Sequence, residues 1–184
     1  VARLQRLVLL GAPILPLPMG KGVPLKDWRH LQTTEARNTV HAHNLRALML
    51  HRDAEVTPAA IALHAHNVAR DRMRRRRLTT TSLLGDTLGR ITCPTWLLYG
   101  AEDVLYRDRW TDVAHAVRSM PAVRRLTLLP DAGHWVQHEA ADEVNALLAQ
   151  LLRGPAPGRR ITGRSAACAR HQRQHRLRKG LRRL

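Results

Sequence analysis

The sequence predicts an α/β protein built on a parallel sheet. Three segments have the length of strands: the unbroken apolar run Leu7–Leu10, then Thr95–Tyr99, and Val123–Leu129, which ends in the apolar run Leu126–Leu129. Helical patterns lie between and after them. Unbroken apolar runs are typical of strands buried on both faces, and strands that alternate with helices through short loops form βαβ units. The segment Trp28–Leu88 has no strand pattern, so we expect it to be a helical insertion between two strands.

The first strand and the first helix are separated by a long loop. Gly11 closes the strand, and Ala12–Pro24 is rich in Pro and Gly, which predicts a loop. Helical spacing follows over Trp28–His51, with apolar members Leu31, Val40, Leu45, Leu48 and Met49.

A second helix has a clear start. Thr57 is a typical N-cap, and Pro58 is favoured at the first helical position. We expect this helix to run to about Arg77, with Ile61, Leu63, Val68 and Met73 facing inward. A further short helix is predicted over Ser82–Leu88.

The last part of the chain repeats the strand–helix alternation. The second strand ends at Gly100, and a helix is expected over Tyr106–Met120, because Pro121 stops it. After the third strand, the pattern over Val136–Leu152 predicts one final helix.

Asp103 and His134 follow two consecutive strands. Active groups of parallel sheets lie at the carboxyl ends of strands, so we expect these side chains to meet in a hydrogen bond of roughly 2.6 to 3.2 Å. Gly133 should let the backbone turn tightly behind the imidazole. A carboxylate that orients an imidazole is the arrangement that activates a hydroxyl nucleophile, although such a histidine can also be an ordinary loop residue.

The nucleophile is not evident. The three serines are Ser82, a predicted N-cap, Ser119, at a predicted helix end, and Ser165. Ser165 lies in a loose imitation of a nucleophile elbow, but it follows the histidine and has no strand before it.

The composition is that of one domain. A chain of 184 residues can bury a core, which Leu, Val and Ala must fill because Phe is absent. Cys93 and Cys168 form neither a disulfide framework nor a zinc site, which fits a reducing compartment.

The sequence has no membrane-length apolar run and no signal peptide, so we expect a soluble, cytoplasmic protein. Because the first residue is Val1, we expect a processed start or a piece of a longer protein.

The net charge of +17 is concentrated at the C-terminal end. Arg153–Leu184 has 11 Lys and Arg and no acidic residue, whereas the preceding residues have 20 basic and 14 acidic ones. Such a segment is typical of a disordered basic tail. The alternative function is therefore nucleic-acid binding through Arg159–Arg183. Because aromatic residues are absent there, any such binding is expected to be non-specific and salt-sensitive.

Other basic and histidine-rich patterns do not predict sites. The pairs His41/His43 and His64/His66 are two apart, which on a helix places their rings on different faces, so no metal site is expected. Arg74–Arg77 is expected to be a solvated helix end.

Three segments together resemble the second half of the α/β-hydrolase fold: Leu7–Pro13 (LVLLGAP), Cys93–Asp103 (CPTWLLYGAED) and Ala132–Glu139 (AGHWVQHE). The resemblance implies a partial α/β-hydrolase fold whose three parallel strands correspond to the sixth, seventh and eighth of the family. It also implies hydrolase core at 1–19 and 90–153, a helical cap at 20–89, and the basic tail at 154–184.

By that resemblance, Asp103 and His134 are the acid and base of a Ser-Asp-His triad. The first five strands, the oxyanion loop and the nucleophile elbow have no counterpart in the sequence. We therefore expect a truncated hydrolase that is inactive alone, needs no cofactor and acts on a small-molecule substrate. The sequence leaves the oligomeric state open.

The motif from Gly133 to Glu139 is most similar to the hydrolases that cleave carbon–carbon bonds in meta-ring-fission products. In those enzymes a Trp beside the His lines the pocket and a cap Arg binds the substrate carboxylate, which implies substrate-binding roles for Trp135 and Arg70. Epoxide hydrolases, haloalkane dehalogenases and esterases share much of this half, so the bond cleaved, carbon–carbon or ester, stays open.

Overall fold

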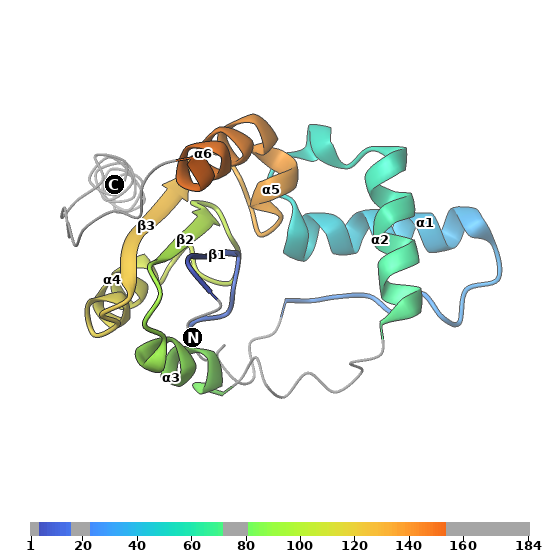
Figure 1. The fold of residues 1–184 in the computed structure, drawn as a ribbon. Coiled ribbons are helices and arrows are strands. Elements are labelled where there is room, and N and C mark those ends of the chain that lie inside the picture. The colour runs from blue at the N-terminus through green and yellow to red at the C-terminus, as the bar shows by residue number, and fades with distance from the viewer. Residues whose placement is uncertain (1–3, 16–22, 72–80, 154–184) are drawn as a thin grey trace, which may run out of the picture.

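A computed structural model describes residues 4–15, 23–71 and 81–153. Its sheet has three parallel strands in the order β1 (Leu7–Leu10), β2 (Thr95–Gly100) and β3 (Val123–Leu129) (Figure 1). Leu10 of β1 lies opposite Leu98, and Gly100 of β2 lies opposite Leu129. The carboxyl ends of the three strands therefore meet at one edge of the sheet, as predicted.

The strands differ in how well they are covered. Every residue of β2 is buried, because this strand lies between the other two. The residues of β1 are only half-buried, which is less than expected for a strand buried on both faces. The cause is its position: within the described residues, β1 has a neighbouring strand on one side alone.

Helices cover both faces of the sheet (Figure 1). On one face, α3 (Leu83–Arg90) and α4 (Trp110–Arg118) share the main hydrophobic core with Leu7 and Leu9 of β1. On the other, α5 (Val136–Glu139) and α6 (Ala141–Arg153) pack through Val136 and Val144, with Leu10 of β1 against them. The buried members of the main core are Ile14, Leu88, Leu97, Tyr99, Tyr106, Trp110, Val113, Met120 and Val123.

The helical insertion lies beside this core as a separate layer. It contains α1 (Thr34–Asn44), a π-helical turn (Leu45–Met49), a short 3-10 helix (Asp53–Glu55) and α2 (Pro58–Arg70). Figure 1 places α1 and α2 across one another, away from the sheet. We call residues 23–71 the cap.

The two cap helices begin as helix-capping rules require. Thr33 Oγ1 accepts from the amide of Ala36 at 3.2 Å, and Thr57 Oγ1 accepts from that of Ala60 at 3.2 Å. The predicted start at Thr57–Pro58 is therefore confirmed, whereas the first helix begins at Thr34 and not at Trp28. The structure describes α2 as far as Arg70, where Asp71 turns extended; 72–80, with Arg74–Arg77, lies outside the described residues.

One position of α2 that was expected to face inward does not. Leu63 is 48% exposed, and Ala60 and His64 are the buried residues of the helix. The helix thus turns a polar ring toward α1, which an apolar pattern alone does not predict.

Two predicted helices in the core are shorter than expected. Helix α4 begins at Trp110, because residues 104–108 form turns after Asp103. The final helix is divided at Ala140, whose φ of −122° interrupts α5 and α6. Glu139, the last residue of α5, is buried and bonds back to other loops, which accounts for the break.

The boundary between cap and core also differs from the expected position. Leu88 of α3 belongs to the main core, and Gly85 lies against the backbone of Ile14. Helix α3 is thus part of the core, although the prediction placed 83–89 in the cap. The predicted basic tail at 154–184, including Ser165 and Cys168, lies outside the described residues. In the part of the chain that the structure describes, no helix is both long enough and apolar enough to cross a bilayer.

Candidate active site

Asp103 lies in a tight turn immediately after β2 and is fully buried. Its Oδ1 accepts from the amide of Leu105 at 3.0 Å, and its Oδ2 lies 3.0 Å from Nδ1 of His134. The carboxylate therefore has a partner for each oxygen, as a buried charge requires. The distance to His134 falls within the range predicted from the sequence.

An aromatic cluster packs against the turn that carries Asp103. The rings of Tyr99, Tyr106 and Trp110 contact one another at 5.4 to 5.8 Å, and Trp110 Nε1 donates to the carbonyl of Ala101 at 2.9 Å. Burial raises the pKa of Tyr106 to about 12, and the negative charge of Asp103 adds to the effect. Burial also raises the pKa of Tyr99, so both phenols are neutral at neutral pH, and Tyr106 donates to the carbonyl of Leu15.

His134 is held at a point where three loops converge. A Cβ on Gly11, which has a φ of +57°, would lie 3.0 Å from the carbonyl oxygen of His134. A Cβ on Gly100 would lie only 2.1 Å from the carbonyl oxygen of Ala132. Both positions therefore require glycine: Gly11 for its left-handed backbone, and Gly100 because another loop crosses over it.

The tight turn before His134 depends on Asp131 and not, as predicted, on Gly133. Asp131 takes the left-handed conformation, with a φ of 55°, whereas Gly133 does not have a positive φ. Glycine is needed at 133 for a close approach, since a Cβ there would lie 2.9 Å from the amide nitrogen of His51 in the cap. The cap therefore touches the backbone directly beside the candidate catalytic histidine.

The bond to Asp103 fixes the proton of the imidazole. A carboxylate can only accept, so Nδ1 of His134 carries the hydrogen and Nε2 retains the lone pair in the neutral ring. The side chain of His134 is 22% exposed and lines a cavity of about 270 Å³. This arrangement places a proton acceptor at a solvent-accessible cavity and its orienting carboxylate behind it.

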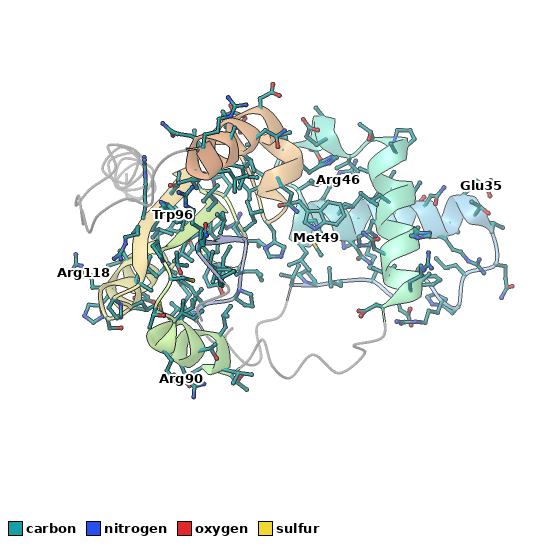
Figure 2. The ribbon with its side chains drawn as sticks, viewed as in Figure 1. Glu35, Arg46, Met49, Arg90, Trp96 and Arg118 are labelled. Atoms are coloured by element: carbon teal, nitrogen blue, oxygen red, sulfur yellow. The ribbon has the colours of Figure 1, made fainter. Side chains whose placement is uncertain are left out.

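The cavity lies between the cap and the core. Its cap wall comes from the π-helical turn and the residues after it, and its core wall from the loops after β2 and β3. Figure 2 labels Arg46 and Met49 on the part of the cap that faces the core. The lining residues are Arg46, Ala47, Leu48, Leu50, His51, Glu102, Val104, Arg107, Gly133 and His134.

Solved structures share this architecture. A meta-cleavage product hydrolase of Pseudomonas fluorescens IP01 superposes with a TM-score of 0.58 at 16% identity, over 80% of this chain and 55% of that one. A 2-hydroxy-6-oxo-6-phenylhexa-2,4-dienoate hydrolase of Rhodococcus sp. strain RHA1 gives a TM-score of 0.51 at 20% identity, over 82% of this chain and 56% of that one. The chain has a partial α/β-hydrolase fold.

The sequence comparisons find a partial relative and no family model. Epoxide hydrolase B of Mycobacterium tuberculosis is 36% identical over 77 residues, which are 40% of this chain and 21% of that protein. No protein-family model matches the sequence. The chain spans about half the length of the solved hydrolases and about a fifth of the length of this curated relative.

In this α/β-hydrolase fold, Trp135 lies at the junction with the cap. Its ring is half-buried and packs with the cap residues Leu45 and Leu50, and its centroid is 6.4 Å from that of His64. Trp135 is not among the residues that line the cavity. Its predicted substrate-binding role is therefore not supported by this placement and stays a prediction.

Arg70 is not brought to the cavity. It is exposed at the end of α2, and its guanidinium lies 2.9 Å from Nε2 of His66 in the same helix. The arginines that line the cavity are Arg46 from the cap and Arg107 from the core. Sequence reasoning missed both, because neither lies beside a recognised motif.

Neither described serine lies at the candidate site. Ser82 Oγ donates to Asp86, and Ser119 Oγ donates to the carbonyl of Ala116 at the end of α4. Neither lines the cavity beside His134. The described residues therefore bring a carboxylate and an imidazole to the candidate site without a serine beside them.

A buried histidine pair joins the two cap helices. Nδ1 of His41 in α1 lies 3.2 Å from Nδ1 of His64 in α2, and the two side chains are almost fully buried. Sequence reasoning missed this contact, because each ring was assessed against its own helix and not against the other. Among the described residues, no group of three or more His, Cys, Asp or Glu side chains could hold a metal ion.

Proposed function

We propose that the chain provides the cap and the acid–base pair of a Ser-Asp-His hydrolase, and that residues outside this sequence provide the nucleophile and the oxyanion hole. The proposal is carried by one observation: a fully buried carboxylate holds Nδ1 of His134 at 3.0 Å while the same imidazole borders a cavity. The likeness to solved hydrolases supports the same interpretation.

The geometry supports a separate role for each group. His134 Nε2 takes the proton of the nucleophilic hydroxyl as its oxygen bonds to the substrate carbonyl carbon. Asp103 stabilises the resulting imidazolium and prevents the ring from turning. His134 then returns the proton to the leaving group as the scissile bond breaks, and activates a water that hydrolyses the acyl-enzyme.

The cavity favours a small anionic substrate. Arg46 and Arg107 enter its lining from opposite walls, with one acidic neighbour, Glu102. Arg46 also binds Asp53 at 2.7 Å, which orients its guanidinium. We propose that these two arginines hold a substrate carboxylate, the role assigned to Arg70 from the sequence, and that a carbon–carbon or ester bond of that substrate is cleaved.

The test is to restore the missing half. A longer polypeptide, or a second polypeptide that carries a nucleophile elbow, is combined with the chain, and turnover of ester and meta-ring-fission substrates is measured. We expect activity that His134→Ala lowers by about 10³-fold or more, because the general base is lost. Asp103→Asn should lower kcat by a comparable factor, since Asn permits the wrong tautomer.

His115→Ala is the matched control. His115 is exposed on α4 and lies outside the cavity, so its removal should leave turnover unchanged. The 184-residue chain alone should give no turnover above background. Restored activity that survives His134→Ala would disprove the assignment.

A further inference from the structure

The carboxylate of Glu139 joins the cap to the loop that carries His134. The residue is 6% exposed, at the end of α5. Its Oε1 accepts from the amides of His51 at 2.8 Å and Arg52 at 2.7 Å, both in the cap. Its Oε2 accepts from the amide of Gly133 at 2.5 Å, in the core. One side chain thus bonds three backbone amides from two separate parts of the molecule.

A second link lies on the other side of His134. The amide of Trp135 donates to the carbonyl of Met49 at 2.8 Å. The residues before and after His134 are therefore both tied to the cap segment 49–52, one through Glu139 and one directly. The guanidinium of Arg52 also donates to the backbone carbonyl of Glu139, which adds a further hydrogen bond between the cap and α5.

This junction has little room to adjust. A Cβ on Gly133 would lie 2.9 Å from the amide nitrogen of His51 and 3.0 Å from Oε2 of Glu139. Close packing of this kind transmits a displacement instead of absorbing it. A movement of the segment 49–52 must therefore either break the Glu139 bonds or carry Gly133 and His134 with it.

The cavity lies at the same junction. His51 and Leu50 line it from the cap, and Gly133 and His134 line it from the core. A ligand in the cavity consequently contacts both sides of the link that Glu139 makes.

We propose that Glu139 is a positioning residue that couples the placement of the cap to the orientation of His134 toward Asp103. With the carboxylate bonded on both sides, the imidazole is aligned with Asp103 only when the cap is docked. The coupling rests on the proposed function only for the catalytic role of His134, because the link between cap and loop is a property of the 184-residue chain itself.

Glu139→Gln is the decisive variant. The side-chain amide keeps the shape but has a single acceptor oxygen, so it can serve the cap amides or the Gly133 amide and not both. The NH₂ group of the glutamine must then face a backbone N–H group, and two donors cannot bond each other. Glu143→Gln is the matched control, because Glu143 is exposed in the first turn of α6 and the substitution removes the same charge.

The first measurement uses the 184-residue chain and follows the His134 Nδ1–H proton and backbone amide exchange by NMR. In Glu139→Gln we expect the Nδ1–H proton and the Gly133 amide to exchange about tenfold faster or more, while amides of β2 stay within about twofold of the unmodified protein. Glu143→Gln should change neither. If the amides of His51 and Arg52 lose protection while the Nδ1–H proton is unchanged, Glu139 holds the cap alone and the proposal is overturned.

Gly133→Ala opens the same junction without altering the carboxylate. Its methyl group must displace His51 or Glu139, so it should produce the same faster exchange at His134. This variant keeps the inference testable if Glu139→Gln fails to fold. An unchanged His134 signal in a folded Gly133→Ala protein would also overturn the coupling.

The second measurement separates this inference from the proposed function. This measurement uses the chain combined with the polypeptide that carries the nucleophile. There, Glu139→Gln should lower kcat by about tenfold or more and change KM by less than about threefold, because it misorients His134 without removing a substrate contact. An active enzyme whose kcat is insensitive to Glu139→Gln contradicts the coupling alone. A combination that shows no activity, with the exchange result at His134 as expected, contradicts the proposed function and leaves the coupling supported.

Discussion

At the scale of single residues, two histidines lie in contrasting surroundings. His134 has a buried carboxylate against Nδ1 and a cavity beside the ring. His64 is 5% exposed and faces His41 and the ring of Trp135, with no carboxylate in hydrogen-bond contact among the described residues. Burial, with a smaller contribution from His41, lowers the pKa of His64 from 6.5 to about 4.

The lowered pKa of His64 predicts that the cap loses stability in acid. Below about pH 6.5 the unfolded chain takes up a proton at His64 that the folded cap excludes until about pH 4. The stability that the cap gains from a neutral His64 is therefore complete above pH 6.5. It falls by about 1 to 3 kcal/mol as the pH drops toward 4. Amide exchange of α1 and α2 at a series of pH values measures it.

His64→Gln provides the comparison for that experiment. It removes the titrating group and keeps a polar side chain that can bond His41, so the free energy of cap opening, obtained from amide exchange after correction for the intrinsic rate, should lose most of its pH dependence in this range. Burial also lowers the pKa of His41, which leaves a smaller residual slope. Equal slopes in the two proteins would show that another group controls the acid response.

At the scale of elements, the close approach of the loop after β3 to Gly100, at the end of β2, determines the geometry of the site. A Cβ at this position would lie 2.1 Å from the carbonyl oxygen of Ala132 and 2.2 Å from that of Gly133. Gly100→Ala should therefore destabilise the fold by about 3 kcal/mol and move the loop that carries His134. Denaturant unfolding measures the first effect, and loss of the protected His134 Nδ1–H signal reports the second.

Gly89→Ala is the contrasting variant. Gly89 lies in α3, and a Cβ added to it would have no neighbouring heavy atom within 4 Å, so alanine should stabilise the helix by about 0.5 to 1 kcal/mol. Equal stability of the two variants would show that the close approach at Gly100 does not constrain the fold.

The sequence predicted elements whose causes are local and missed those whose causes are not. The strand Val123–Leu129 and the helix start at Thr57–Pro58 have the predicted bounds, because apolar runs and capping residues act within a few positions. The division of the final helix at Ala140 was missed, since it follows from bonds that Glu139 makes to the cap, 87 and 88 residues away in sequence.

The same distinction applies to the candidate site. Asp103 and His134 could be paired in advance because parallel strands bring their carboxyl ends together. The cavity arginines and the His41–His64 contact could not, because they depend on how the cap packs against itself and against the core. Helical periodicity shows which face of a helix is apolar, but it does not identify the surface that the face meets.

At the scale of the whole molecule, the outer edge of β1 is the feature most prone to self-association. Leu7 and Gly11 donate their amides toward β2, so by alternation the amides of Val8 and Leu10 point to the other side. No described strand pairs with that side. We expect the isolated chain to be poorly soluble or to associate through this edge.

Val8→Pro tests the edge directly. It removes one outward amide without removing a bond to β2, so it should reduce association measured by light scattering across a concentration series. Val8→Ala keeps the amide and should still associate. A sharp, cooperative melt from a monomeric unmodified chain would contradict the expectation.

The basic segment at 154–184 gives a prediction at the same scale. Its composition offers too few apolar residues for a core, so a chain that ends at Arg153 should keep its free energy of unfolding within about 0.5 kcal/mol. Mild trypsin should remove the segment first, and a salt titration on RNA with and without it measures any non-specific binding. Protection of Arg159–Arg183 from trypsin would show that the segment packs against another surface.

The distribution of the four tryptophans allows the cap and the sheet layer to be monitored separately by fluorescence. Trp96 and Trp110 are buried in the sheet layer, whereas Trp28 and Trp135 are half-buried and contact the cap histidines. With Trp28 and Trp135 replaced, indole emission comes from the core alone. With Trp96 and Trp110 replaced, it comes from the cap and its junction with the core. Opening of the cap and unfolding of the sheet should then appear as separate fluorescence transitions in the same chain, and a neutral imidazole that becomes charged in acid should quench the cap signal first.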